Sequence, residues 1–208
     1  MKILYGTSNE AKLAYMRFML KDLPIEILGL NDVDLETVDV IQDGKTPLEN
    51  ATKKAKAYYN AFSMPVFACD SGLFLDGYRL DMQPEVNIRC RNGRRLSDDE
   101  MILYYSGLAQ NNGGEILAWY ENAICLMKNC DECFAHQGTD IASERFIISE
   151  KPSPVRREGF PIESLSKHVG TGQYFLEEEI LETNTFKVDQ EMAKGFRQFF
   201  VRHLGLAV

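Results

Sequence analysis

The sequence predicts an α/β protein in which helices flank a mixed central sheet. In the first half of the chain, short apolar runs alternate with segments that carry helix-start signals, and two long apolar runs joined by a polar turn follow. Alternating strands and helices build a parallel sheet, whereas a hairpin adds antiparallel strands. The 208 residues are enough for one large domain, or for two lobes that share a core.

The first strand and the first helix are predicted at the N-terminus. Residues 2–5 form a short apolar run, and the loop Gly6-Thr7-Ser8-Asn9 follows it. Thr7-x-x-Glu10 fits a capping box, which predicts that a helix starts here. Apolar residues recur at helical spacing along it, at Leu13, Met16, Leu20 and Leu23.

The second helix has the clearest start signal in the chain. Gln42-Asp43-Gly44 predicts a turn, and Thr46 and Pro47 then suit the N-cap and the first helical position, with Glu49 as the partner of Thr46. The apolar face predicted for this helix consists of Leu48, Ala51, Ala55, Tyr59 and Phe62. A buried strand is predicted over residues 66–69, and it runs directly into Asp70-Ser71-Gly72.

The second half of the chain is predicted to hold a helix, a hairpin and a final helix. The capping box Ser97-Asp98-Asp99-Glu100 starts a third helix, which Asn111-Asn112-Gly113-Gly114 ends. The elements expected after it are strands over 115–127 and 134–148 with a polar turn at 128–132, a loop-rich stretch over 150–175, and an amphipathic helix over 188–204 that Gly195 weakens.

Composition excludes several classes of protein. With 45% hydrophobic residues and 26% charged residues, the chain is an ordinary globular protein, and no apolar run approaches the ~18 residues of a membrane span. The apolar run at the N-terminus is too short for a secretory signal, and five cysteines leave one unpaired, so a reducing cytoplasm is expected. A net charge of −8 argues against nucleic acid as a partner, although a local group of lysines can still bind a small anion.

The loop between the first strand and the first helix is a candidate phosphate site. Free backbone N–H groups at a helix start favour an anion, and Thr7, Ser8, Asn9 and Lys12 would add polar side chains and a positive charge. The alternative is that Thr7 to Asn9 only cap a surface helix.

Asp70-Ser71-Gly72 is the most informative motif because it directly follows a buried strand. Ligands of open α/β sheets bind at the carboxyl ends of strands, and a carboxylate at such a position suits Mg²⁺. The alternative is an aspartate that accepts hydrogen bonds from loop amides. On the second helix, Glu49 and Lys53 fit a solvated ion pair, and the functional interpretation is that Glu49 faces a metal while Lys54 reaches a phosphate.

Two further groups of residues are candidate sites. One of the clustered arginines Arg89, Arg91, Arg94 and Arg95 would suit a bidentate phosphate contact, although most such clusters are solvated. Zinc is a less favoured interpretation of the second group, because one CxxC is a weak signal and lies at a predicted turn. That group consists of Cys125, Cys130, Cys133 and His136. His168 and His203 have no evident partners for a catalytic triad.

Together these segments resemble the inosine-triphosphate pyrophosphatase family, which hydrolyses aberrant purine nucleoside triphosphates. Thr7-Ser8-Asn9-Glu10-Ala11-Lys12 is similar to the family's phosphate loop, Glu49-Asn50-Ala51-Thr52-Lys53-Lys54-Ala55 to its Glu-Asn-Ala-x-x-Lys-Ala helix, and Cys69-Asp70-Ser71-Gly72-Leu73 to its Asp-Asp-Ser-Gly-Leu segment. Pro84 to Gly93 and Gly159-Phe160-Pro161-Ile162-Glu163 are fainter matches.

The resemblance implies a magnesium-dependent pyrophosphohydrolase that converts a nucleoside triphosphate into a monophosphate and pyrophosphate. It implies that residues 1–208 form one elongated domain of two lobes with a cleft, and that the protein is a homodimer. Asp70 would be the catalytic residue and would hold Mg²⁺ with Glu49 or Asp43. The substrate-binding residues that it implies are Thr7, Ser8, Asn9, Lys12, Lys54, Ser71, Phe160, Glu163 and Lys194, with Phe160 stacking on the base.

The chain also departs from the family pattern. Cys69 replaces the first aspartate of the pair, Gln42 stands where the family has a glutamate, and Met192-Ala193-Lys194-Gly195 replaces the Ser-His-Arg that reads the base. These departures leave open a nucleotide-binding protein without turnover, and a hydrolase with a shifted nucleotide substrate. A further alternative is an interaction module whose acidic segment 32–43 docks a basic partner.

Overall fold

The computed structural model describes residues 1–33, 38, 40–91, 93–182 and 189–206. The chain divides into two compact units. Unit 1 comprises Met1–Gly72, Glu121–Ser143 and Val188–Val208, and unit 2 comprises Leu73–Tyr120 and Glu144–Lys187. The acidic residues Asp34, Glu36 and Asp39 of the proposed docking segment lie outside the described residues.

The predicted α/β architecture with a mixed sheet is confirmed. Within the described residues, one sheet of seven strands has the order β2-β1-β3-β6-β8-β9, with β7 paired to β6. Its strands are β1 (Lys2–Tyr5), β2 (Glu26–Leu28), β3 (Val66–Leu75), β6 (Glu115–Met127), β7 (Cys133–Gln137), β8 (Phe146–Ser149) and β9 (Ser166–His168). β1 pairs in parallel with β2 and β3, whereas β6–β7, β6–β8 and β8–β9 are antiparallel. A separate small hairpin joins β4 (Cys90–Arg91) to β5 (Arg94–Arg95).

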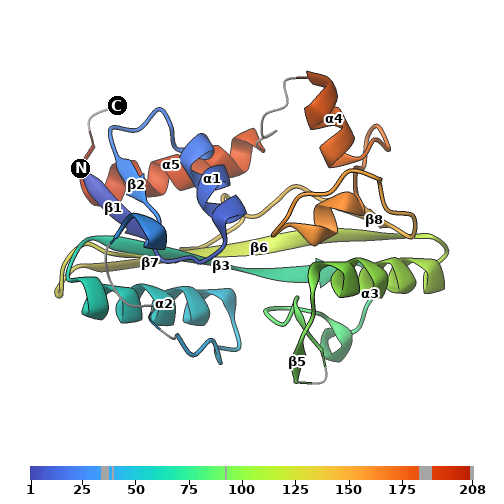
Figure 1. Cartoon of the computed structure of the whole chain (residues 1–208), viewed down its shortest axis with the longest axis horizontal. Coiled ribbons are helices and arrows are strands. Elements are labelled where there is room, and N and C mark those ends of the chain that lie inside the picture. Colours follow the sequence, from blue (N-terminus) through green and yellow to red (C-terminus); the bar gives the residue numbers. More distant parts are fainter. Residues whose placement is uncertain (34–37, 39, 92, 183–188, 207–208) are drawn as a thin grey trace. The chain divides into compact units, whose positions relative to one another are not determined.

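Unit 1 has helices on both faces of its part of the sheet. Helix α2 (Pro47–Phe62) covers one face, and α1 (Glu10–Met19) and α5 (Gln190–Leu204) lie on the other (Figure 1). The side chains sort accordingly, because successive residues of a strand point to opposite faces. Val66 and Ala68 pack with α2, whereas the Phe67 ring contacts the Phe200 ring of α5 at 5.0 Å between centroids.

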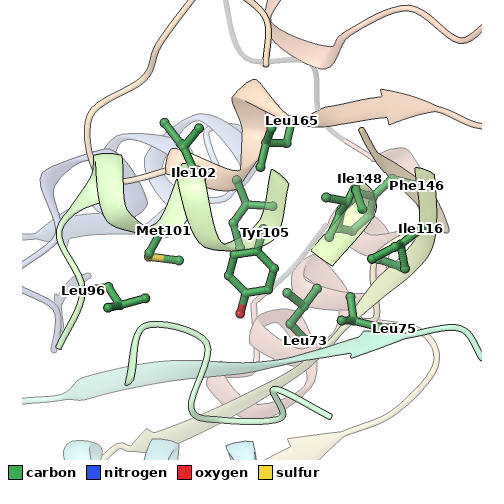
Figure 2. Packing of buried hydrophobic residues seen from close by; sticks show 13 residues of the cluster. Leu73, Leu75, Leu96, Met101, Ile102, Tyr105, Ile116, Phe146, Ile148 and Leu165 are labelled. Atoms are coloured by element: carbon green, nitrogen blue, oxygen red, sulfur yellow. The ribbon is translucent and has the colours of Figure 1, made fainter. Parts of the chain in front are cut away.

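Unit 2 has its own core around α3 (Asp98–Asn111). Figure 2 shows Tyr105 of this helix among Leu73 and Leu75 of β3, Ile116 of β6 and apolar residues of β8. Tyr105 is fully buried, and its hydroxyl donates to the Ile88 carbonyl at 2.9 Å, so this buried phenol is paired. The short elements of this unit are the 3₁₀ turns Leu80–Met82 and Pro161–Ser164 and helix α4 (Phe175–Glu182). None of the described helices is both long and apolar enough to span a membrane.

Several predicted boundaries are confirmed. Thr46 and Ser97 are the N-caps of α2 and α3, and β6 covers the predicted residues 115–127. The final helix begins at Gln190 rather than near Val188, which lies outside the described residues.

Other local predictions are wrong. The N-cap of α1 is Asn9 and not Thr7, because the Asn9 side chain accepts from the Lys12 N–H. Gln42 to Gly44 form no turn, since the Gly44 N–H donates to the Asn50 side chain at 2.8 Å instead. The predicted strand 134–148 is two strands, β7 and β8, which pair with opposite ends of β6. Helix α4 was not predicted.

The buried face of α2 is rotated from the predicted one. Ala51 and Ala55 are buried as expected, but the remaining buried positions are Pro47, Asn50, Lys54 and Tyr58. Two tertiary contacts account for this rotation. Tyr58 packs so closely on Gly6 that a Cβ there would lie 2.4 Å from the ring, and Lys54 turns inward toward β3.

Candidate active site

An ion pair joins α2 to β3 in unit 1. Lys54 Nζ donates to Asp70 Oδ1 at 2.9 Å and to the Cys69 carbonyl at 2.6 Å. The two side chains are only 11% and 14% exposed. A charge pair so far removed from water needs good geometry to be stable, and here the Cys69 carbonyl provides Lys54 with a second acceptor.

The sequence analysis predicted that Asp70 follows the end of a strand. In the structure, Asp70 lies inside strand β3. Strand β3 continues through Asp70, Ser71 and Gly72 to Leu75. Its partner β1 ends earlier, however, since the last paired residues are Tyr5 and Phe67. Asp70 therefore lies past the carboxyl end of β1, where the loop Gly6 to Asn9 begins. The strand that ends near Asp70 is thus its neighbour β1 and not β3 itself.

Cys69 faces the opposite side of β3, beside Tyr5. Burial raises the pKa of the Cys69 thiol to about 12, against the opposing influence of the Lys54 and Lys12 ammonium groups. Burial, with Cys69 and Asp70 nearby, also raises the pKa of Tyr5 well above 10.0. Cys69 is consequently a neutral thiol. Lys12, which follows the predicted phosphate loop, and Lys54 both act electrostatically on this residue of β3.

The loop Gly6 to Asn9 is held by its own hydrogen bonds. The Gly6 N–H donates to the Phe67 carbonyl at 2.8 Å, which anchors the loop to β3. Thr7 Oγ1 accepts from the Asn9 N–H at 3.2 Å, and Asn9 Oδ1 accepts from the Lys12 N–H at 3.1 Å. Asn9 therefore has the capping role that the alternative interpretation gave to this loop, and the same bonds fix the loop beside β3. Ser8 is exposed.

The two other carboxylates proposed for Mg²⁺ have different partners. Glu49 Oε2 accepts from the Lys45 N–H at 2.7 Å, and Asp43 Oδ1 pairs with Lys53 Nζ at 2.5 Å. The hydrogen bond from Lys53 lowers the pKa of Asp43 below 3.8. In the part of the chain that the structure describes, no three His, Cys, Asp or Glu side chains converge as a metal site. Of the three carboxylates proposed for Mg²⁺, Asp70 is the one that pairs with the shielded Lys54.

Sequence reasoning missed Asn122 of β6. Ser71 Oγ donates to Asn122 Oδ1 at 2.7 Å, and Asn122 Nδ2 donates to the Ile141 carbonyl at 2.8 Å. A polar pair, Glu121-Asn122, interrupts an otherwise largely apolar strand, and that interruption is the signal that would have identified it.

Comparison with known proteins identifies the family. The sequence model of the Ham1 family matches residues 3–139, which include the loop at Gly6, the Lys54–Asp70 pair and Asn122. This chain belongs to the Ham1 family. The resemblance inferred from the motifs is therefore confirmed.

Curated relatives match about half of this Ham1 chain or less. A dITP/XTP pyrophosphatase of Geobacter sulfurreducens is 37% identical over 98 residues, which cover 47% of this chain and 48% of the relative. One of Aquifex aeolicus is 40% identical over 76 residues, covering 36% of each chain. The chain thus spans about half the length, or less, of the curated relatives that it matches.

Solved Ham1 structures share the fold along almost the whole chain. The Ham1 protein of Staphylococcus aureus superposes with a TM-score of 0.68 at 18% identity, covering 96% of this chain and 98% of that one. A Ham1 protein of Coxiella burnetii gives a TM-score of 0.69 at 21% identity, covering 97% and 99%. At these identities the likeness establishes the fold alone.

The Ham1 match ends before Phe160, Glu163 and Lys194. Phe160 precedes the 3₁₀ turn Pro161–Ser164 in unit 2, and Glu163 pairs with Arg157 at 3.0 Å. Lys194 belongs to α5 in unit 1, is 63% exposed and lies 3.8 Å from Glu191. Their proposed contacts with the substrate stay predictions.

Three of the clustered arginines, namely Arg89, Arg91 and Arg94, have partners within unit 2. Arg89 pairs with Asp98 at 2.5 Å, and Arg94 pairs with Glu100 at 2.8 Å. Arg91 donates to the Tyr105 hydroxyl at 3.1 Å and covers the Tyr104 ring. These contacts favour the structural interpretation of the cluster.

The zinc interpretation of the Cys/His group is not supported by the geometry. Cys133 and His136 are three residues apart on β7, so their side chains point to opposite faces of the sheet. Cys133 Sγ lies 3.6 Å from Cys125 Sγ, whereas His136 binds Asp140 at 2.9 Å. Of the other two histidines, His168 pairs with Glu178 of α4 at 2.6 Å and the His203 ring stacks on Phe134.

Proposed function

We propose that this Ham1 protein is a nucleoside triphosphate pyrophosphohydrolase, which hydrolyses a triphosphate to a monophosphate and pyrophosphate. The names of its relatives support aberrant purine nucleotides, such as inosine or xanthosine triphosphate, as substrates. The observation that carries the proposal is the buried Lys54–Asp70 pair beside the loop that begins at Gly6. It places an acid and a cation together past the carboxyl end of β1, a combination that phosphoryl transfer uses.

Two lysines and a loop are proposed to bind the triphosphate. Lys54 and Lys12 both act on Cys69, so their positive charges influence one short stretch of β3. Cations held in place before the substrate arrives stabilise the charge that develops on the leaving pyrophosphate without further reorganisation. Lys54 would exchange its contact with Asp70 for a phosphate oxygen.

Asp70 is proposed to orient the attacking water and to accept its proton. Its carboxylate, freed from Lys54, would also hold Mg²⁺ together with water and substrate phosphate, since this ion is commonly bound through one or two carboxylates. The ion would supply charge neutralisation at the phosphate oxygens. Glu49 and Asp43 are kept as further candidate ligands, although both are now engaged elsewhere.

A second candidate function is nucleotide binding without turnover. The neutral thiol of Cys69, which replaces a carboxylate of the family motif, favours it. A hydrolase with a shifted substrate is the remaining alternative, because Met192 to Gly195 replace the base-reading motif.

One experiment separates these possibilities. Pyrophosphate release is measured over a panel of normal and modified nucleoside triphosphates, with and without Mg²⁺, and binding of each is measured in chelator. The proposal expects Mg²⁺-dependent release from inosine or xanthosine triphosphate. Binding without release supports the second function, and release from another nucleotide supports a shifted substrate.

Homodimerisation is proposed from the family resemblance, and a cytoplasmic location from the odd number of cysteines. Light scattering of the purified chain tests the first, since a dimer has twice the mass of the 23.7 kDa monomer. Fractionation of cells that express the tagged chain tests the second.

A further inference from the structure

Ser71 neighbours Asp70 on β3 but faces the other side of the sheet. Asp70 contacts Lys54 of α2, whereas Ser71 contacts Asn122, which in turn lies 3.4 Å from the Met192 sulfur of α5. This is the alternation expected for consecutive residues of a strand. The two side chains therefore serve different groups of partners.

The direction of each hydrogen bond around Asn122 follows from chemistry. The Ile141 carbonyl has no proton to give, so the group of Asn122 that faces it at 2.8 Å must be the amide nitrogen. The amide oxygen then faces Ser71 at 2.7 Å. An amide oxygen only accepts, so the single proton of the Ser71 hydroxyl is directed to Asn122.

We propose that Asn122 is a positioning residue of the active site, a role that rests on the function proposed above. It takes the proton of Ser71, so the Ser71 hydroxyl offers only lone pairs to a bound molecule and does not donate to a phosphate oxygen. It also ties β3, beside Asp70, to the segment at Ile141 and to the first turn of α5. Asn122 thus holds the strand that carries the catalytic carboxylate.

The test compares Ser71→Ala, Ser71→Thr, Asn122→Ala and the double variant Ser71→Ala/Asn122→Ala with the unchanged protein. Asn129→Ala is the matched control, because the Asn129 side chain is also hydrogen-bonded, with Oδ1 accepting from the Asp131 and Glu132 N–H groups, but lies in the turn between β6 and β7. Binding of inosine triphosphate in chelator, kcat and KM with Mg²⁺, and unfolding in urea without nucleotide are measured for each.

Ser71→Ala and Asn122→Ala are each expected to lower kcat by about 10- to 100-fold, the order that a small misplacement of a catalytic group costs. Ser71→Thr, which keeps the hydroxyl, is expected to restore kcat. The double variant is expected to be no worse than the poorer single variant, because both remove the same contact. Ser71→Ala is expected to change nucleotide affinity in chelator by less than about twofold, because no donor to phosphate is lost.

Two results overturn the proposal. A tenfold or larger loss of affinity in chelator for Ser71→Ala means that Ser71 donates to the phosphate. An Asn122→Ala protein whose kcat and KM match those of Asn129→Ala means that Asn122 is only structural.

The unfolding data separate a failure of this proposal from a failure of the proposed function. If the unchanged protein neither binds nor hydrolyses any triphosphate, the proposed function fails and the site role of Asn122 fails with it. The hydrogen bond is still tested, because it predicts that the two single substitutions are coupled by about fivefold in the unfolding equilibrium constant. Additive effects on unfolding contradict the hydrogen bond itself.

Discussion

Lys54 Nζ lies 2.9 Å from Asp70 Oδ1, and both side chains are almost completely shielded from water. The adjacent residue Lys53 makes a shorter ion pair, at 2.5 Å to Asp43, but those side chains are 46% and 69% exposed. The chain therefore offers two consecutive lysines, each with one aspartate, in contrasting environments.

Lys54→Met is expected to destabilise the fold by about 3 kcal/mol, because it leaves the Asp70 carboxylate shielded without its partner. Lys53→Met is expected to change stability by no more than about 0.5 kcal/mol, because an exposed pair is screened by water. Urea unfolding of both variants measures the difference. Equal effects would show that burial of the Lys54–Asp70 pair has no energetic consequence.

Asp70→Asn tests the catalytic role, with stability measured beside activity. The asparagine side chain has the same shape and can still accept from Lys54, but it leaves the shielded Lys54 ammonium without its counter-charge, so the urea midpoint is expected to fall, as it does for Lys54→Met. Activity is therefore measured under conditions in which both the unchanged protein and the variant are folded. Pyrophosphate release is expected to fall by about 10²–10³-fold, the usual cost of removing one catalytic electrostatic group. Release at the unchanged rate would refute the role assigned to Asp70.

Replacement of two helical glycines by alanine is expected to change the stability of the fold in opposite directions. A Cβ on Gly195 of α5 would lie 2.1 Å from the Asp140 carbonyl oxygen, whereas a Cβ on Gly107 of α3 would meet nothing within 4 Å. Gly107→Ala is expected to stabilise by about 0.5–1 kcal/mol through helix propensity. Gly195→Ala is expected to destabilise by about 2 kcal/mol or more, because backbone must move. Thermal unfolding of the two variants shows whether each substitution raises or lowers stability. A stabilising Gly195→Ala would contradict the close approach of α5 to Asp140.

Local signals explain which elements the sequence made predictable. The N-caps Thr46 and Ser97 bond to residues three positions on, and β6 is a long apolar run between two turns, so neighbouring residues carry the information. The other elements depend on contacts between residues that are distant in the sequence. Strand β3 continues past Gly72 partly because the Leu73 N–H reaches the Glu85 carbonyl. Helix α4 has an acid-rich sequence, and its Glu178 is paired with His168 of β9.

The candidate site was predictable only where a motif marked it. Lys54 and Asp70 were expected to lie in one site because each belongs to a motif that resembles the same family. The ion pair between them agrees with that expectation. Asn122 belongs to no such motif, and its importance depends on Ser71 and Ile141, which are distant in sequence. Sequence spacing also suggested a shared role for Cys133 and His136, which the alternation of strand side chains prevents.

Cys69 is expected to resist alkylation. Because burial raises the pKa of its thiol to about 12, roughly a thousandfold less thiolate exists at pH 8 than for an ordinary exposed cysteine. Cys90 and Cys130 are exposed and act as internal controls. Mass spectrometry after timed iodoacetamide treatment is expected to find both labelled well before Cys69. Equal labelling rates would mean that the thiol is not buried, and that the site carries more negative charge than Asp70 alone provides.

Asp98 is expected to make folding sensitive to acid. Burial by itself would raise the pKa of Asp98, but hydrogen bonds from Arg89 and the Gly159 N–H outweigh it, and the pKa falls below its ordinary value of 3.8. A carboxyl whose pKa is lower in the folded state stabilises the fold above the unfolded value, and that contribution is lost as the pH falls through the folded value. The difference in unfolding free energy between the unchanged protein and Asp98→Asn should therefore be constant near neutrality and shrink below about pH 4. Asp99→Asn, at an exposed position in the same helical turn, is the control. Urea unfolding between pH 2 and 7 provides the measurement, and a difference that does not depend on pH would mean that the Arg89–Asp98 pair does not favour the charged form.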